Sequence, residues 1–594
     1  MTGTPLFPDL PESQPQDHPA GVAAGAVYVP ARQMRATSGW RLGAVSGGLA
    51  IAMLAIAGKL VITAAPGTVP PANAAALAQA PQALHVTPTD SERSTLPRAK
   101  IFDRNGALLA YSAPVHSLYA YPYEVPDAAA TADALAGEFP WLDRDLLAKR
   151  LSSKTDDFVY IARHLTPAQY FEALRLGLPG VRSQKEYRRI YPQGSLVAHV
   201  VGLTRSDQTA ISGIEAYYDA DLVGAAQDPV ALSIDVRVQA VVREELQAQI
   251  DTYAAAGGAG VVMDVRTGEL VASVSLPDFD PNQLGKRDPK LEHNRVSNGV
   301  YELGSVFKPI VAAIALDTNV AKSDTMLDAT RPIYVDGYTI RDFHGRNRWL
   351  SVSDVLVHSS NIGAARLAVE VGVERLVQYF DRFGLLTAPN MDVYEVRAPQ
   401  APAKWQELNA MTSAYGYGLS VSPAQFVAAF AALVNGGTLY SPTLLQINDF
   451  RSAQGKTVLR AETSAAMRGM LRQVVANGTG RNADTRLYPV GGKTGTALKR
   501  GGARGYSDDK RISSFIGAFP IDNPRYAVFV MVDEPQERAI TGRYATGGKV
   551  AAPAISRIVD RIAPMLGVKP QPAQMQDKQQ KRSTHGLVAA VARN

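Results

Sequence analysis

An uncharged apolar run near the amino terminus constrains this chain more than any other feature. Residues 42–58 read LGAVSGGLAIAMLAIAG, seventeen residues without a charge, and the run can continue to residue 64 if Lys59 extends toward lipid headgroups. A helix that crosses a membrane needs about 20 apolar residues. Arg32, Arg35 and Arg41 precede the run, which predicts a cytoplasmic amino terminus by the positive-inside rule. We therefore expect a cytoplasmic tail at 1–41, a single transmembrane helix at 42–64, and the rest of the chain outside the cytoplasm.

Two other interpretations of this run are a cleaved signal peptide and a buried helix of a globular domain. Ala72-Asn73-Ala74 has the small residues typical of a signal-peptide cleavage site. However, a polar leader of about forty residues is long for a signal peptide, and the apolar run exceeds the usual length of its hydrophobic core. These observations favour an uncleaved anchor.

Charge and composition exclude several classes of protein. Residues 65–96, rich in Ala, Pro and Thr, are typical of a linker, and residues 568–594 have the composition of a disordered basic tail. That tail holds five basic residues and one acid, which is four of the net six positive charges of the chain. Because the remainder is nearly neutral and no aromatic residues alternate with basic ones, we expect no nucleic-acid partner. The chain has no cysteine, which excludes disulfide scaffolds and thiolate chemistry.

Between the linker and the tail lie two regions of different pattern. Residues 97–229 mix short strand-like runs with helical stretches and contain the turn signal Asn105-Gly106, which predicts an α+β accessory domain. Residues 230–567 begin with a helix and two strands around Thr267-Gly268, continue through several helices, and end with two more strands. Strands at both ends that enclose a helical insert predict an antiparallel sheet packed against a helical cluster.

Ser305 and Lys308 form a Ser-x-x-Lys spacing where a helix is expected to begin. Residues i and i+3 share a helical face, so the lysine amine can reach the serine hydroxyl. A serine hydroxyl needs a neighbouring base to act as a nucleophile, and lysine is a base only when burial or nearby positive charge keeps its amine neutral. Alone, this spacing is a weak signal of catalysis.

Two further motifs strengthen it. Ser359-Ser360-Asn361 is a polar trio between two apolar helical runs, where buried serines would need partners. Lys493, Thr494, Gly495 and Thr496 offer, on an edge strand, a cation for a substrate carboxylate, hydroxyl groups, and a glycine that permits close backbone approach. A nucleotide-binding phosphate loop would need glycine where Leu487 stands, so we reject that interpretation.

The ordered motifs Ser-x-x-Lys, Ser-x-Asn and Lys-Thr-Gly resemble those of penicillin-binding proteins and class A β-lactamases. Further segments resemble class B penicillin-binding proteins, although Ala99 replaces a glycine that is usual in the family: Arg98–Ala110, Tyr191-Pro192, Val201-Gly202, Ser212–Glu215, Pro277–Asn282, Tyr301–Ser305 and Tyr415–Pro423. The resemblance implies the α+β transpeptidase fold at 230–567, a pedestal domain at 97–229, and a D,D-transpeptidase that cross-links peptidoglycan stem peptides and is inhibited by β-lactams.

The resemblance also implies roles for individual residues. Ser305 would be the acylated nucleophile and Lys308 its general base. Ser359 would relay protons to the leaving group, and Asn361 would hold the amide of the peptide donor. Lys493 and Thr494 would bind the terminal carboxylate. The backbone N–H groups of Ser305 and Thr496 would form the oxyanion hole. No metal or other cofactor is implied, and the histidines show no spacing typical of a metal site.

Other functions remain as alternatives. A class A β-lactamase needs a deacylating glutamate in an E-x-x-L-N segment, and Glu407-Leu408-Asn409 is two residues short of it. A D,D-carboxypeptidase, a β-lactam-sensing receptor and a non-catalytic scaffold are further alternatives.

Within the family, the lead-in to Ser305 and the short pedestal resemble the division-specific FtsI type more than the elongation type. This resemblance implies a septal protein of the inner membrane with a periplasmic catalytic domain. Its partners would be an FtsW-like glycosyltransferase and other divisome proteins.

Overall fold

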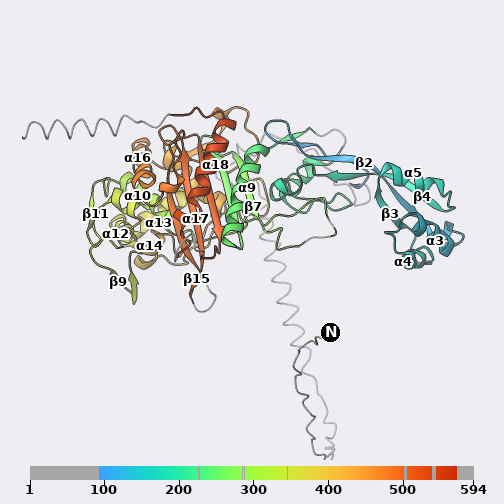
Figure 1. Ribbon diagram of the computed structural model, residues 1–594, viewed down its shortest axis with the longest axis horizontal. Helices are drawn as coiled ribbons and strands as arrows, with labels where there is room; N and C mark the ends of the chain where they lie inside the picture. Colours follow the sequence, from blue (N-terminus) through green and yellow to red (C-terminus); the bar gives the residue numbers. More distant parts are fainter. Residues whose placement is uncertain are drawn as a thin grey trace, which may run out of the picture. The chain divides into compact units, whose positions relative to one another are not determined.

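The computed structural model describes residues 93–224, 228–283, 285, 288–343, 345–500, 505–537 and 544–571 (Figure 1). The predicted tail, transmembrane helix and most of the linker lie outside these ranges, as does the basic tail from residue 572. Among the helices of the described ranges, none combines the length and apolar character needed to span a bilayer.

The first region is built on a five-stranded sheet with the order β3-β2-β1-β5, in which β4 also pairs with β2. At the predicted Asn105-Gly106 turn, the Asp103 carboxylate accepts hydrogen bonds from the backbone of Asn105 and Ala107, so that hairpin is confirmed. The elements are β1 (Ile101–Phe102), β2 (Leu108–Ala120), α3 (Ala128–Glu138), α4 (Arg144–Leu151), β3 (Val159–Leu165), α5 (Pro167–Arg175), β4 (Val181–Ile190), α6 (Ala198–Val201), α7 (Gly213–Tyr217), α8 (Asp219–Leu222) and β5 (Val230–Ala231).

A buried ionic cluster holds this region together around Glu215. Its two carboxylate oxygens accept from Arg98 Nε at 2.8 Å and from Arg189 Nε at 2.6 Å, and all three side chains are almost completely buried. Arg98 also pairs with Asp219, which in turn pairs with Arg93. The cluster thus ties the start of β1 to β4 and α7.

The second region contains the antiparallel sheet that the sequence predicts, with the order β14-β15-β16-β6-β7. Strands from the two ends of the region meet where β16 pairs with β6, for example Val528 opposite Val262. The strands are β6 (Gly257–Asp264), β7 (Leu270–Leu276), β14 (Gly491–Arg500), β15 (Tyr506–Phe519) and β16 (Tyr526–Asp533).

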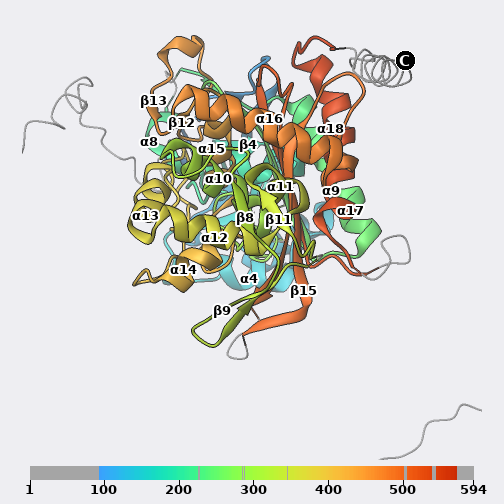
Figure 2. The same ribbon diagram turned by 90° about the vertical axis from the view of Figure 1, so that its left-hand side faces the viewer.

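Helices cover both faces of this sheet (Figures 1 and 2). Helices α9 and α18 pack on one face, and α15 and α16 lie with the helical cluster on the other. Successive residues of β6 therefore enter different cores, with Val261 facing the helical cluster and Val262 facing α9 and α18. Because both faces are buried, every residue of β6 and β16 is buried, and each strand is an apolar run up to its final aspartate.

The helices of this region are α9 (Val236–Tyr253), α10 (Lys308–Asp317), α11 (Val352–His358), α12 (Asn361–Val371), α13 (Val373–Arg382), α14 (Glu407–Ser413), α15 (Pro423–Val434), α16 (Ala461–Asn477), α17 (Gly547–Val550) and α18 (Ala552–Met565). Three two-stranded sheets lie between them: β8 (Met326–Asp328) with β11 (Trp349–Ser351), β9 (Ile333–Val335) with β10 (Tyr338–Ile340), and β12 (Thr438–Tyr440) with β13 (Gly455–Thr457).

Candidate active site

Ser305 and Lys308 lie at the junction of a short 3-10 turn, η4 (Gly304–Phe307), and α10. The helix predicted at this point therefore begins as a tighter turn, in which residues i and i+3 lie one above the other. Lys308 Nζ is 3.0 Å from Ser305 Oγ. Ser305 is half-buried and Lys308 is only 1% exposed, so the amine is almost completely shielded from solvent.

Ser359 is the point at which the three sequence motifs converge. It lies between α11 and α12 in the left-handed conformation, with φ at 59°. Its hydroxyl lies 3.2 Å from Lys308 Nζ and 2.9 Å from Lys493 Nζ. Lys308 Nζ also donates to the Ser359 carbonyl at 2.6 Å and to Asn361 Oδ1 at 2.8 Å. One hydroxyl is thus shared between two buried lysines.

Strand β14 forms the edge of the large sheet, as predicted for the Lys-Thr-Gly motif. A Cβ atom on Gly495 would stand 2.6 Å from the Leu303 carbonyl oxygen, so only glycine lets β14 pack against the turn that carries Ser305. The close backbone approach that requires glycine here is therefore that of Leu303, a residue of the same chain.

The two threonine hydroxyls of the motif contact groups outside the lysine–serine cluster. Thr494 Oγ1 is 2.7 Å from the hydroxyl of Thr479, and Thr496 Oγ1 accepts from Gly547 N at 3.0 Å. Thr494 Oγ1 is also 3.4 Å from Lys493 Nζ. The sequence contained no signal for Thr479 or Gly547 as neighbours of the site.

Burial controls the protonation of both lysines. The pKa of Lys308 lies well below its ordinary value, first because burial disfavours the charged amine and second because Lys493 adds a nearby positive charge. Burial alone lowers the pKa of Lys493 to about 7. Lys308 is therefore suited to accept a proton, whereas a bound carboxylate would favour the charged form of Lys493.

Asp342 is a neighbour of the site that the sequence motifs did not reveal. Its Oδ2 accepts from the Ser360 hydroxyl at 2.8 Å, and its Oδ1 accepts from the backbone N–H groups of Asn361 at 2.5 Å and Ile362 at 3.0 Å. A carboxylate is favoured at this end of α12 because the helix dipole is positive there. Asp342 therefore holds the Ser-x-Asn motif in place.

We expect Asp342→Asn to slow acylation by a labelled penicillin about tenfold and to lower the free energy of unfolding by about 1–3 kcal/mol, because buried donors at the start of α12 lose an acceptor. Acylation rates and chemical denaturation measure the two effects. Asp336→Asn makes the same change in the exposed turn of the β9–β10 hairpin and should alter neither. Equal acylation rates for the two variants would contradict this role for Asp342.

The lowered pKa of Lys493 predicts a pH-dependent stability. Between its folded pKa of about 7 and its unfolded value of 10.5, the unfolded chain binds more protons, so the free energy of unfolding rises with pH. We expect the wild type to gain up to about 1.4 kcal/mol per pH unit over Lys493→Met above pH 7. Chemical denaturation from pH 6 to 9 tests this. Lys322→Met, which removes an exposed lysine, should keep the wild-type slope, and a parallel slope for Lys493→Met would refute the prediction.

Comparisons with known proteins find matches to both regions of the chain. Residues 258–560 match the penicillin-binding protein transpeptidase domain, and residues 93–230 match the penicillin-binding protein dimerisation domain. The chain is 38% identical to a protein of Caulobacter vibrioides described as a probable peptidoglycan D,D-transpeptidase FtsI, over 80% of this chain and 82% of that one. It is 32% identical to the peptidoglycan D,D-transpeptidase FtsI of Escherichia coli, over 81% and 86% of the two chains.

A solved structure shares the fold of the catalytic region. The transpeptidase domain of penicillin-binding protein 3 from Burkholderia pseudomallei is 35% identical and superposes with a TM-score of 0.52, covering 57% of this chain and 97% of that one. The chain therefore belongs to the class B penicillin-binding proteins of the FtsI type, and it is a serine-type peptidoglycan D,D-transpeptidase.

Proposed function

We propose that Ser305 carries the acyl group in this reaction and that Lys308 is its general base. The observation that carries the proposal is the 3.0 Å distance between Ser305 Oγ and the buried, pKa-lowered amine of Lys308. The Ser305 hydroxyl transfers its proton to Lys308 as Oγ attacks the carbonyl carbon of the D-Ala–D-Ala bond. The backbone N–H groups of Ser305 and Thr496 stabilise the resulting oxyanion.

Collapse of the tetrahedral intermediate breaks the C–N bond and releases D-alanine, which receives its proton through Ser359. The position of the Ser359 hydroxyl between Lys308 and Lys493 supports this relay. An amine of a second stem peptide then attacks the Ser305 ester, forms the cross-link and regenerates the hydroxyl. No metal or other cofactor takes part in these steps.

The same site positions the donor peptide. Lys493 and Thr494 bind its terminal carboxylate, and Gly495 allows the edge strand to lie against the Ser305 turn. Asn361 holds an amide of the donor, with Asp342 and the Arg341 carbonyl orienting the Ser-x-Asn segment. A β-lactam would occupy the same position and acylate Ser305.

Labelled penicillin tests this assignment. We expect covalent label on the wild type and none on Ser305→Ala; label that does not depend on Ser305 would refute it. Incubation with a D-Ala–D-Ala donor and an amine acceptor separates the related activities, because a transpeptidase forms the cross-linked product whereas a carboxypeptidase only hydrolyses the donor. Rapid hydrolysis of the penicillin would instead indicate a β-lactamase.

At the level of the cell, we propose a division enzyme of the inner membrane. Residues 42–64 would anchor it, with 1–41 in the cytoplasm, a linker at 65–96, the pedestal at 97–229, the catalytic domain at 230–567 in the periplasm and a basic tail at 568–594. The FtsI names of the relatives support a septal role beside an FtsW-like glycosyltransferase and other divisome proteins. A fluorescent fusion should concentrate at the septum, and uniform side-wall signal would instead support an elongation enzyme.

A further inference from the structure

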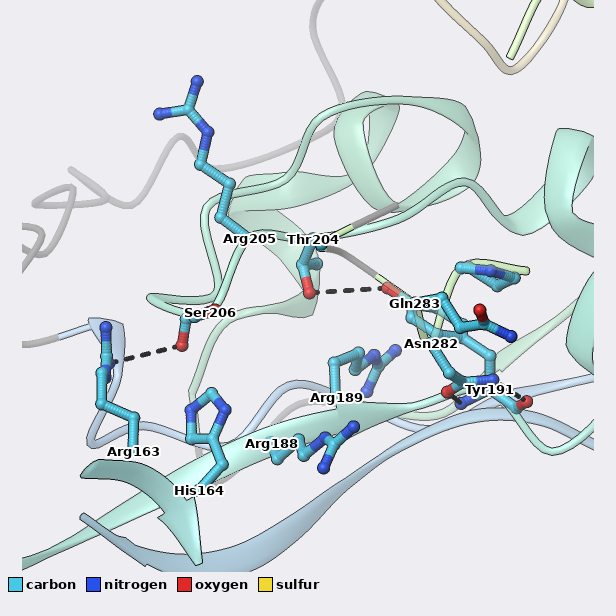
Figure 3. Close-up of a pocket in the computed structure, with 12 residues that line it drawn as sticks. Arg163, His164, Arg188, Arg189, Tyr191, Thr204, Arg205, Ser206, Asn282 and Gln283 are labelled. Atoms are coloured by element: carbon cyan, nitrogen blue, oxygen red, sulfur yellow. Dashed lines mark hydrogen bonds between the residues drawn. The ribbon is translucent and has the colours of Figure 1, made fainter. Parts of the chain in front are cut away.

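A cavity lies where the first region meets the segment that follows β7 (Figure 3). Its volume is about 440 Å³. Strands β3 and β4 and the loop at 204–206 supply one part of its wall, and residues 281–283 and 285 supply the other. The described residues that line it are Arg163, His164, Arg188, Arg189, Tyr191, Thr204, Arg205, Ser206, Pro281, Asn282, Gln283 and Gly285.

The lining is strongly basic. It contains four arginines and, within the described part of the chain, no carboxylate. Arg163 forms an ion pair at 2.9 Å with Glu186, a residue that does not line the cavity. Arg188 and Arg205 are exposed, and neither forms an ion pair with any residue that the structure describes. Within the described ranges, these two positive charges of the lining therefore have no counter-charge.

The inner wall has a further donor without a partner. Arg189 is 6% exposed; its Nε donates to Glu215 at 2.6 Å and its Nη1 to the Arg98 carbonyl at 3.2 Å. Its Nη2 is buried and has no hydrogen-bond partner among the described residues. Because Glu215 also serves Arg98, the carboxylate does not fully neutralise Arg189. Buried donors are normally satisfied, so this nitrogen can take an acceptor such as water or an anion.

His164, which also lines the cavity, has a ring nitrogen that makes no hydrogen bond within the described structure. Its Nε2 is buried without a hydrogen-bond partner in the described ranges. Burial, reinforced by Arg163, lowers the pKa of His164 to about 4, so the ring is neutral at neutral pH and adds no positive charge to the lining. Figure 3 shows His164 beside Arg163, with Arg188 and Arg189 further along the wall.

We propose that this cavity binds a small molecule or chain end that carries two or more oxyanions, either phosphates or carboxylates. The planar guanidinium group binds both kinds of anion through paired hydrogen bonds. Arg189 adds a buried positive charge to the lining, and the exposed Arg188 and Arg205 add two more that can attract an anion to the cavity. This site is separate from Ser305, and the proposal does not rest on the catalytic roles given above.

The occupant would bridge the two regions of the chain. The Asn282 side chain binds the backbone of Tyr191 twice, accepting from its N–H at 3.0 Å and donating to its carbonyl at 3.0 Å. Both residues line the cavity. A ligand that contacts both regions should therefore raise the melting temperature of the protein, because it binds only when the two regions are assembled.

Isothermal titration calorimetry on the full-length protein at physiological salt tests the site, with pyrophosphate and citrate as probes. We expect saturable one-to-one binding of at least one probe; a phosphate ligand predicts tighter binding of pyrophosphate and a carboxylate ligand tighter binding of citrate. Arg188→Glu combined with Arg205→Glu should weaken binding at least tenfold. Both side chains are exposed and unpaired within the described structure, so the double variant should fold.

Two controls separate a built site from general electrostatics and from catalysis. Lys149→Glu with Arg150→Glu makes the same charge change on exposed residues of α4, outside the cavity, and should bind as the wild type does. Ser305→Ala should also bind normally. The proposal is overturned if neither probe binds saturably, if the Arg188/Arg205 variant binds as the wild type does, or if the α4 variant loses as much affinity.

Discussion

Replacing Lys308 with methionine should slow acylation of the protein by labelled penicillin about 10³-fold, within the range that a general base contributes. Methionine has similar length but no amine, so the Ser305 hydroxyl loses the only lysine amine within 3.0 Å of it in the described structure. The measurement is the rate of covalent labelling under single-turnover conditions, with a thermal melt to check that the variant is folded.

Two further variants test why Lys308 is needed. Lys308→Arg places a permanent cation at this position but cannot act as a base, because the guanidinium group does not lose its proton in proteins. It should therefore be about as slow as Lys308→Met. Lys322→Met is the control for the substitution itself and should label at the wild-type rate. A Lys308→Arg variant within tenfold of the wild type would show that positive charge, rather than proton transfer, is what the site requires.

Glu215→Gln should produce the largest loss of stability, about 3–5 kcal/mol in the free energy of unfolding. The glutamine has no charge to offset Arg98 and Arg189, whose side chains are 0% and 1% exposed. Removing one partner from a buried ion pair leaves the other charge without compensation, and that cost exceeds the net value of the pair. Denaturant unfolding followed by circular dichroism measures it.

A matched substitution and a double-mutant cycle separate this effect from a simple change of charge. Glu172→Gln breaks an ion pair of similar length with Arg175, at 2.8 Å, but both side chains are well exposed. It should cost less than about 1 kcal/mol. Arg98→Met combined with Glu215→Gln should cost clearly less than the sum of the two single changes. Additive losses would mean that Arg98 and Glu215 do not stabilise each other.

Many elements of the fold could be predicted because their signals are local. Helix α3 begins at the Asp127 cap and α5 at the Thr166 capping box, both within the region 97–229, where the sequence predicts a mixture of strands and helices. The β6–β7 hairpin turns at Thr267-Gly268 as expected. The strand pairs at the two ends of the catalytic region were predicted as one sheet, but their order was not. That order depends on contacts between residues more than 200 positions apart.

The site divides in the same way. Spacing along the chain is enough to bring Ser305 and Lys308 together, because residues i and i+3 of a helical turn lie on the same face in any surroundings. The partners of Ser359 could not be read from spacing, since they are supplied by α10 and by an edge strand 134 residues away. No motif in the sequence pointed to Asp342. A single aspartate in a loop shows its role only when the fold places it against the start of a helix, here α12.

The sequence by itself therefore determined the chemistry available to this protein: two serines, two lysines and an asparagine in ordered motifs, and the local turns that carry them. The tertiary structure decided how those groups behave. It buried Lys308 and Lys493 together, which lowers the pKa of each lysine and leaves one hydroxyl between them. It also gathered four arginines around a cavity without a carboxylate in its described lining. Burial and the proximity of distant charges are properties of packing, and no local pattern encodes them.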